Sequence, residues 1–429
     1  MKKQIFTAPL LYVGLAMAAS TAHAASLMEI YNLAVGNDPQ YQSAQAGLAA
    51  AKEALPQSTA NFLPALSAGA SHTENSDSDV GSTDTASITL TQPLYRNGSF
   101  VQRRSAKSVV TQAEADYQSA EQSLIIDVAQ AYFNVLAAQD NLEFAEAEKA
   151  SNARQLDQTQ QRFDVGLVAI TDVHESQAAY DISVAGAIEA ANNLDSAKEA
   201  LREITGSYPE NLATLGDNLP LQLPEPNDLK AWTDMALANN PALHSAEQST
   251  EQAREYVNAQ RSGNYPTLDL VVNHSQSNTD NPFLSATTDS TTATVQLNIS
   301  LYEGGRTSSY ITQAREYLKQ SQQALEQTRR ATQRTVRNAY RGVLSGISRV
   351  KALKQALISN QSALRAAEAG YEVGTRTTVD VLVARRNLFS AQRDYAQSRY
   401  NYLLDTLRLK QAGGDLTSTD LKIVSDWLH

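Results

Sequence analysis

The histidines and the carboxylates near them are the first residues that could carry chemistry in this chain of 429 residues. His244 and Glu247 stand three positions apart, so both would lie on one face of a helix and could bind a metal ion. Two ligands do not make a metal site, and no other pair of the six histidines has the spacing of metal ligands. We therefore predict no catalytic residue, no metal and no cofactor.

A basic stripe at helical spacing is formed by Arg330, Arg334, Arg337 and Arg341. A polyanion could bind there, but a charged helix face that pairs with neighbouring helices is the more ordinary interpretation. The formal net charge of −11 argues against a nucleic-acid partner, which requires a basic footprint. Because the sequence holds no cysteine, disulfides, zinc–thiolate sites and cysteine nucleophiles are excluded.

The first 24 residues have the pattern of a signal peptide. Lys2 and Lys3 form a positive start, residues 5–19 are mostly apolar, and residues 22–24 read Ala-His-Ala, a cleavage site that predicts a mature chain from Ala25. No later run of 18 apolar residues occurs, so an inner-membrane helical protein is not expected. The exported chain is periplasmic, secreted or an outer-membrane β-barrel.

The rest of the sequence is a duplicated unit. Residues 37–39 recur at 239–241, an offset of 202, and residues 165–166 and 172–173 recur at 373–374 and 380–381, an offset of 208. We expect a first repeat over 25–218, a linker over 219–226 and a second repeat over 227–414. A C-terminal equatorial segment over 415–429 completes the chain.

Each half predicts a helix, two strands, a long helix, a turn and a returning helix. The first helix begins after Asn37 or Asp38 and continues to about Ala60. Strands are expected near 65–71, around 88–91, over 268–272 and over 293–301, where apolar and polar residues alternate strictly. The segments that join them, 75–84 and 278–290, are polar and are expected to be loops.

The long helices are the most prominent prediction. No glycine or proline occurs between Ser99 and Val165, and apolar or small residues recur every three or four positions, which predicts a helix of about 100 Å. Its counterpart covers about 307–372, with Gly370 among its weak points. Thr171-Asp172 and Thr378 are expected to cap the returning helices, which end at Gly206 and Gly413. Both turns should lie at the end opposite the strands.

Four strands cannot close a barrel, and an open sheet edge cannot lie in lipid. Several copies must therefore close one barrel together, with their helices forming a tube beneath it. In this arrangement Val295, Leu297 and Ile299 face lipid, whereas Gln296 and Asn298 face the lumen. A soluble sandwich edge is the alternative interpretation of the strands.

Residues 155–173 and 368–382, together with 399–403, resemble the tip motifs of the TolC-like channel-tunnels, the outer membrane efflux protein family. The resemblance covers nearly the whole mature chain. It implies a mainly α fold with a β section, in which long coiled-coil helices and four strands per chain close as a homotrimer. The result is a twelve-stranded barrel in outer-membrane lipid and a helical tunnel in the periplasm. It further implies a passive exit duct for drug efflux or type I secretion.

The resemblance also implies a gate at the tip. Tyr371 matches a tyrosine that bonds the aspartate matched by Asp172. Arg376 matches an arginine that bonds the groups matched by Thr171 and Asp172. Asp380 matches the first of two acidic rings at the constriction. The second ring falls on Val383, so cation binding there is expected to be weaker than in relatives with both rings.

Two turns are implied to dock partners. They are Val165-Gly166-Leu167 and Val373-Gly374-Thr375. They match the turns that face a periplasmic adaptor protein, which in turn joins an inner-membrane pump or ABC transporter. The alternative from another functional class is an exported coiled-coil structural or adhesin-like protein.

Overall fold

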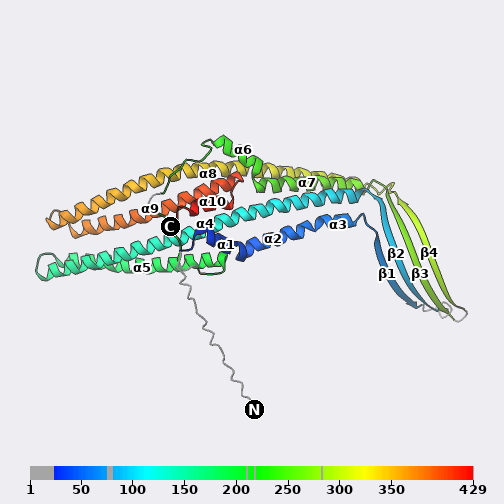
Figure 1. The fold of residues 1–429 in the computed structure, drawn as a ribbon, viewed down its shortest axis with the longest axis horizontal. Helices are drawn as coiled ribbons and strands as arrows, with labels where there is room; N and C mark the ends of the chain where they lie inside the picture. Colours follow the sequence, from blue (N-terminus) through cyan, green and yellow to red (C-terminus); the bar gives the residue numbers. More distant parts are fainter. Residues whose placement is uncertain (1–23, 75–80, 209–210, 217–218, 282–283, 429) are drawn as a thin grey trace, which may run out of the picture.

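The computed structural model describes residues 24–74, 81–208, 211–216, 219–281 and 284–428 (Figure 1). The predicted signal peptide, apart from Ala24, lies outside the described residues. The elements in chain order are α1 (Leu27–Asn37), α2 (Pro39–Lys52), α3 (Ala54–Ala60), β1 (Ala65–Glu74), β2 (Ser82–Arg96), α4 (Asn97–Asp164), α5 (Ile170–Thr205), α6 (Leu229–Asn239), α7 (Pro241–Ser262), β3 (Thr267–Asn281), β4 (Leu284–Asn298), α8 (Arg306–Glu372), α9 (Thr378–Gly413) and α10 (Ser418–Ser425).

The two predicted long helices are present with nearly the expected bounds. α4 has 68 residues and α8 has 67, so each extends for about 100 Å. The returning helices α5 and α9 lie antiparallel beside them, and both turns lie at the end opposite the sheet, as expected (Figure 1). Among the described residues, no helix is both long and apolar enough to cross a membrane.

The first helix of each half departs from the prediction. Asp38 caps α2 by accepting from the N–H of Gln40 at 3.1 Å, as expected, but the helix breaks at Glu53 before α3. The cause is Pro56, which has no N–H to donate to the carbonyl of Lys52 and whose ring crowds that carbonyl. The helices α1 and α6, which precede α2 and α7, were not predicted.

The four strands form one antiparallel sheet in the order β1-β2-β3-β4, so the two halves of the chain meet at the β2–β3 pairing. The prediction of a loop over 278–290 was wrong, because β3 and β4 pair along that segment, for example at Asn278 and Thr287. Threonine and serine fill it, and β-branched threonine favours a strand even where neither face is apolar. Conversely, Ile299 and Leu301 lie beyond the end of β4.

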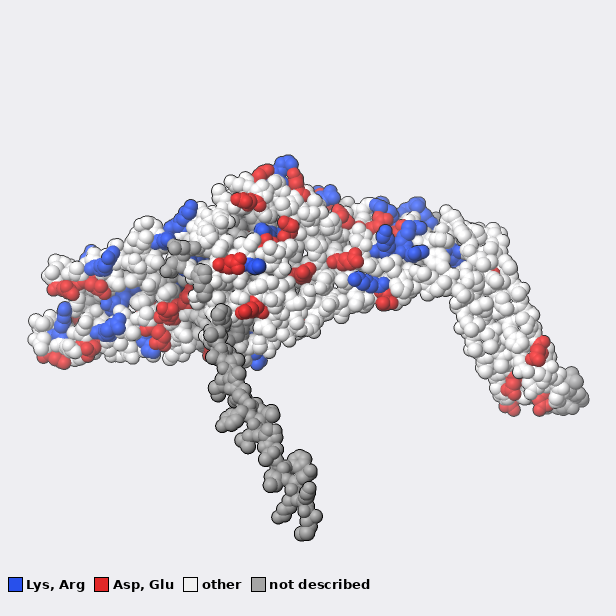
Figure 2. All heavy atoms as spheres, in the orientation of Figure 1, with Lys and Arg blue, Asp and Glu red and all other residues white. Residues whose placement is uncertain are grey.

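The strand register divides the sheet into an apolar face and a hydroxyl-rich face. Leu66, Leu90, Val272 and Ala293 lie in one row across the four strands. On the other face, Thr85 lies 3.4 Å from Ser277, and the Asn273 amide donates to Thr89 at 2.8 Å. Charged residues are sparse over most of the sheet and reappear at its far end (Figure 2). One face therefore suits lipid and the other suits water.

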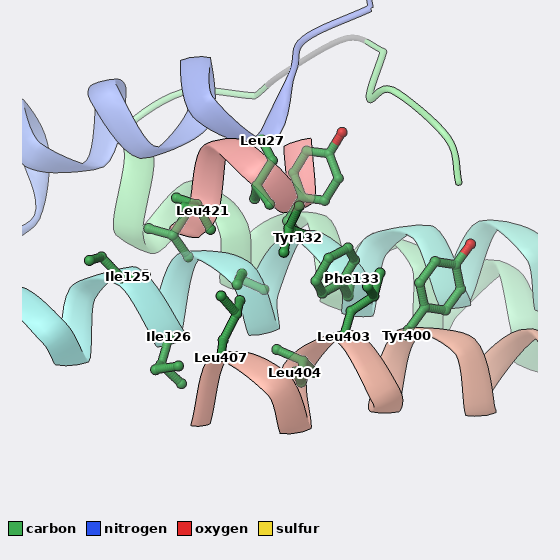
Figure 3. Close-up of a cluster of buried hydrophobic side chains, with 14 of the residues drawn as sticks. Leu27, Ile125, Ile126, Tyr132, Phe133, Tyr400, Leu403, Leu404, Leu407 and Leu421 are labelled. Atoms are coloured by element: carbon green, nitrogen blue, oxygen red, sulfur yellow. The ribbon is translucent and has the colours of Figure 1, made fainter. Parts of the chain in front are cut away.

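The main hydrophobic core lies midway along the helices, where α1 and α10 cover α4 and α9 (Figure 3). Phe133 stacks on Tyr400 with ring centroids 5.7 Å apart, and Leu403 is fully buried. The hydroxyl of Tyr132 donates to the carbonyl of Ala213 at 2.8 Å, so this buried polar group is satisfied. Because the core joins both halves, it fixes the long helices relative to one another.

The segment predicted as a linker lies against this core. The N–H of Gln222 donates to the hydroxyl of Tyr402 at 2.9 Å, and the indole N–H of Trp232 donates to the carbonyl of Pro226 at 2.8 Å. A C-terminal segment containing α10 packs beside it, with Leu421 and Val424 buried. These contacts surround the middle of the long helices.

Candidate functional site

The candidate site is the tip of the helical part, where two turns reverse the chain. Gly166 has φ of +75° and Gly374 has φ of +78°, a conformation that disfavours any residue with a side chain. The N–H of Leu167 donates to the carbonyl of Arg162 at 2.8 Å, and the N–H of Thr375 donates to that of Gly370 at 2.8 Å. Each glycine thus closes the end of a long helix.

The side chains on these turns are apolar and exposed. Val165 is 71% exposed, Leu167 is 74% exposed and Val373 is 75% exposed. Both turns lie at the same end of the molecule (Figure 1). Clustered exposed aliphatic side chains are typical of a surface that another protein covers.

The caps of the returning helices differ from the prediction by one or two residues. Ala169, not Thr171, precedes α5, and its N–H donates to the carboxylate of Asp172 at 3.3 Å. Thr377, not Thr378, caps α9, and its N–H donates to Asp380 at 2.8 Å. In both cases the aspartate occupies the third helical position and reaches back to the free N–H before the helix, which is why the cap begins earlier.

Tyr371 and Arg376 lie at the same tip but do not form the expected links within one chain. The hydroxyl of Tyr371 is buried and has no hydrogen-bond partner among the described residues. Arg162 lies over its ring, 4.8 Å from the centroid. Arg376 lies 3.6 Å from Asp380, and neither Tyr371 nor Arg376 bonds to Asp172 or Thr171 within the described chain. The gate therefore stays a prediction about the assembled protein.

Gly370, which the sequence presents as a weak point of the long helix, has a packing role here. A Cβ at this position would lie 2.6 Å from the Cγ of Arg376, so a larger residue would displace that arginine. The N–H of Arg376 also donates to the carbonyl of Gly370 at 3.2 Å. This glycine lets the turn fold back against the helix.

The carboxylate of Asp380 is held in its charged form. Hydrogen bonds from the backbone N–H and the hydroxyl of Thr377 lower its pKa below the usual range, and the nearby guanidinium of Arg376 adds to this. Val383, at the position of the second acidic ring, is 40% exposed. The first turns of α9 therefore carry one charged residue, Asp380, and one apolar residue, Val383, at the two positions that match the acidic rings.

The other candidates from the sequence have local structural roles. His244 lies 3.4 Å from Glu247 but also contacts the carbonyl of Ala238 at 2.9 Å, beside the start of α7. No group of three potential metal ligands occurs among the described residues. Within the basic stripe, Arg330 pairs with Glu326 at 2.7 Å.

The sequence did not single out the buried arginine near the tip. Arg385 is 8% exposed, pairs with Glu368 at 3.1 Å and donates to the carbonyl of Ser151 at 3.3 Å. It thereby joins α9 to α8 and to α4. No spacing identified it, because its partners come from distant parts of the chain.

The fold and the tip together define a channel component with a membrane sheet and a long helical section. The family model described as "outer membrane efflux protein" matches residues 30–207 and 232–415. The chain belongs to this family. The predicted fold class and outer-membrane location are confirmed, and the adhesin-like alternative is not supported.

Curated relatives cover almost the whole chain. It is 39% identical to the outer membrane protein TolC of Vibrio cholerae, over 95% of this chain and 94% of that protein. It is 36% identical to TolC of Escherichia coli, over 97% and 88%. The alkaline protease secretion protein AprF of Pseudomonas aeruginosa is 29% identical, over 94% and 87%.

Solved structures share the fold. The Campylobacter jejuni CmeC outer membrane channel matches with a TM-score of 0.80 at 18% identity, over 94% of this chain and 90% of that one. The open state of the Neisseria gonorrhoeae MtrE outer membrane channel matches with a TM-score of 0.75 at 19% identity, over 91% and 90%.

Proposed function

We propose that three copies of this chain form a passive exit duct, which carries drugs, small molecules or proteins from a pump to the exterior. The observation that carries the proposal is the four-stranded sheet. Among the described residues, its outer strands β1 and β4 have no pairing partner on their free edges. Three such sheets give twelve strands, enough to close around a water-filled lumen.

The faces of the sheet support this arrangement. Val295 and Leu297 are 63% and 60% exposed on the apolar face, which would contact lipid. In the outer part of β2 and β3 the hydroxyl-bearing Thr85 and Ser277 are half-buried, whereas Ala86 and Gln276 on the opposite face are exposed. The hydroxyl-rich face would line the lumen.

The tip would dock a periplasmic adaptor through the exposed aliphatic side chains on its two turns, and an inner-membrane pump would supply the energy. Toluene efflux is named for one relative, TtgC of Pseudomonas putida, and protease secretion for AprF. Both cargo classes are therefore proposed for this chain.

The gate is proposed to form between copies at the tip. The hydroxyl of Tyr371 is buried and has no hydrogen-bond partner among the described residues, so a hydrogen bond to an acceptor from another copy would stabilise it. Asp172 and Thr171 of the facing turn would supply that acceptor and bind Arg376. Asp380 from three copies would place negative charge near the axis.

The test is a deletion strain compared with the same strain carrying the gene on a plasmid. We expect increased sensitivity to a panel of apolar drugs, lost secretion of one or more proteins, or both, with full recovery on complementation. Unchanged drug sensitivity together with an unchanged set of secreted proteins would contradict the proposed duct.

A further inference from the structure

The two lateral edges of the helical part are formed by α8 on one side and by α5 on the other. α8 packs on α6, α7 and α9, whereas α5 packs on α1, α4 and α9. α8 and α5 follow opposite borders of the molecule (Figure 1). Each helix therefore has a long face that the described part of the chain leaves uncovered.

The uncovered face of α8 is basic. Arg334, Arg337 and Arg341 are exposed and lie on the side of the helix away from the buried Val336 and Tyr340. These three arginines have no ion-pair partner among the described residues. Lys351 continues the exposed face toward the tip, followed by Ile358, which is 48% exposed.

The uncovered face of α5 is acidic. Glu189, Asp195 and Glu203 are exposed and have no ion-pair partner among the described residues. Nearer the tip, Ile182 is 74% exposed and Ile188 is 67% exposed. Isoleucines this exposed on a helix of a folded protein indicate that something covers them.

The opposite charges lie at the same distance from the tip. α8 ends there at Glu372 and α5 begins there at Ile170, so the two helices are antiparallel. Arg341 and Glu203 each lie about 30 residues from these ends, which is about 45–50 Å. Basic and acidic residues would thus face each other if the two edges met.

The exposed isoleucines match in the same way. Ile358 lies about 14 residues before Glu372, and Ile182 lies about 12 residues after Ile170, a difference of about 3 Å along the helices. Two independent features, charge and apolar exposure, therefore agree on one register. The basic face of α8 and the acidic face of α5 cannot meet within one chain, because the two helices lie on opposite borders of the molecule.

We propose that the basic face of α8 in one copy docks on the acidic face of α5 in the next copy, with Arg337 and Arg341 facing Glu203 and Ile358 packing on Ile182. This seam rests on the proposed assembly of three copies. We infer that a second copy covers these faces, because the edges of the sheet lie on the same two borders of the molecule as the uncovered helices. β4 leads to α8, and β1 forms the other sheet edge. Pairing of β4 with the next β1 brings α8 to the opposite border of the next copy.

Pairs of introduced cysteines test the seam. Because the chain holds no cysteine, any disulfide between copies must form between the introduced residues. Full-length Ile182→Cys with Ile358→Cys is oxidised in outer membranes with copper phenanthroline. We expect covalent dimers and trimers on a non-reducing gel, which reductant abolishes, because bridged cysteines need Cα atoms within about 7 Å.

The matched control pairs Ile182→Cys with Ala363→Cys. Ala363 is also exposed and lies only five residues after Ile358 along α8, but it points about 140° around the helix from Ile358. No covalent trimer is therefore expected from this pair. The mass of the detergent-solubilised particle is measured in parallel. A three-copy particle without the Ile182–Ile358 crosslink would overturn the seam, whereas a single-chain particle would overturn the assembly itself.

A charge exchange tests the polar part of the register. Arg337→Glu with Arg341→Glu should lower the trimer-to-monomer ratio in mild detergent about tenfold or more, because three seams each lose their ion pairs. Adding Glu203→Arg should recover most of the trimer. A further loss on adding Glu203→Arg would show that these charges do not face each other.

Discussion

Replacing one residue at a time on β4 tests which face of the sheet meets lipid. Leu297 pairs with Leu268 on the apolar face, and its neighbour Gln296 pairs with Asp269 on the other face. We compare Leu297→Lys with Gln296→Lys. The two variants add the same charge at adjacent positions, so they differ only in the side to which the lysine points.

The two expected magnitudes differ. A lysine on the lipid face costs about 2–4 kcal/mol at the midplane and about 0–1 kcal/mol near the interface. Leu297 lies one residue before the end of β4, toward the interface, so three copies per particle would make its cost up to roughly 3 kcal/mol. A lysine at 296 would remain in water and lie beside the carboxylate of Asp269, which already binds Arg96 at 2.8 Å. Its cost should stay within about 0.5 kcal/mol.

The assay is the fraction of trimer recovered from outer membranes at equal expression, followed by urea unfolding in lipid vesicles. Leu297→Lys should lower the fraction of membrane-inserted trimer and its resistance to urea, and Gln296→Lys should resemble the parent. Equal tolerance of both lysines, or greater damage from Gln296→Lys, would refute the assignment of the two faces.

Three further predictions concern the tip and the middle of the tunnel. Tyr371→Phe with Arg376→Ser should raise conductance in planar bilayers while the trimer persists, because about 1 kcal/mol lost per copy gives roughly a hundredfold shift toward open; conductance equal to the parent would place the gate elsewhere. Asp380→Ala should remove most block by trivalent cations, measured in single-channel recordings. Partial loss of hydration beside the neighbouring helices, and then the Asp38 carboxylate, raise the pKa of Asp127, although the residue keeps exposed surface. The protonated carboxyl therefore stabilises the fold below the ordinary carboxyl pKa, and this stabilisation is lost as the pH rises through the raised pKa. Asp127→Asn should therefore raise the unfolding temperature at pH 8, and by less at pH 4.

The long helices could be predicted closely because their signal is local. From Ser99 to Val165 neither glycine nor proline occurs, and α4 covers Asn97–Asp164. The glycine turns were equally readable, since Gly166 and Gly374 both adopt a positive φ. In each case a single residue type decides the backbone.

The strands were harder because their outer parts lack the alternation that identifies a half-buried strand. Asn278 and Thr287 read as loop residues and yet pair within the sheet. Their position is decided by backbone pairing between neighbouring strands and not by an apolar face. The break at Glu53 was missed although its cause is local. Pro56 cannot donate to the carbonyl of Lys52, so the helix breaks about one turn before the proline and not at the proline itself.

The candidate site divides in the same way. The aspartates that begin the returning helices were identified, but each acts from the third helical position and not from the cap. The contact of Arg162 with Tyr371 and the burial of Arg385 join residues far apart in the chain. Sequence spacing carries no information on such contacts.

Closure of one continuous duct by three copies can be observed by electron cryomicroscopy of the full chain in lipid nanodiscs. We expect a threefold particle with twelve strands in the membrane, an aqueous lumen lined by the hydroxyl-rich face, and a helical tunnel ending at the glycine turns. A particle with another number of copies, or a single chain inserted alone, would contradict it.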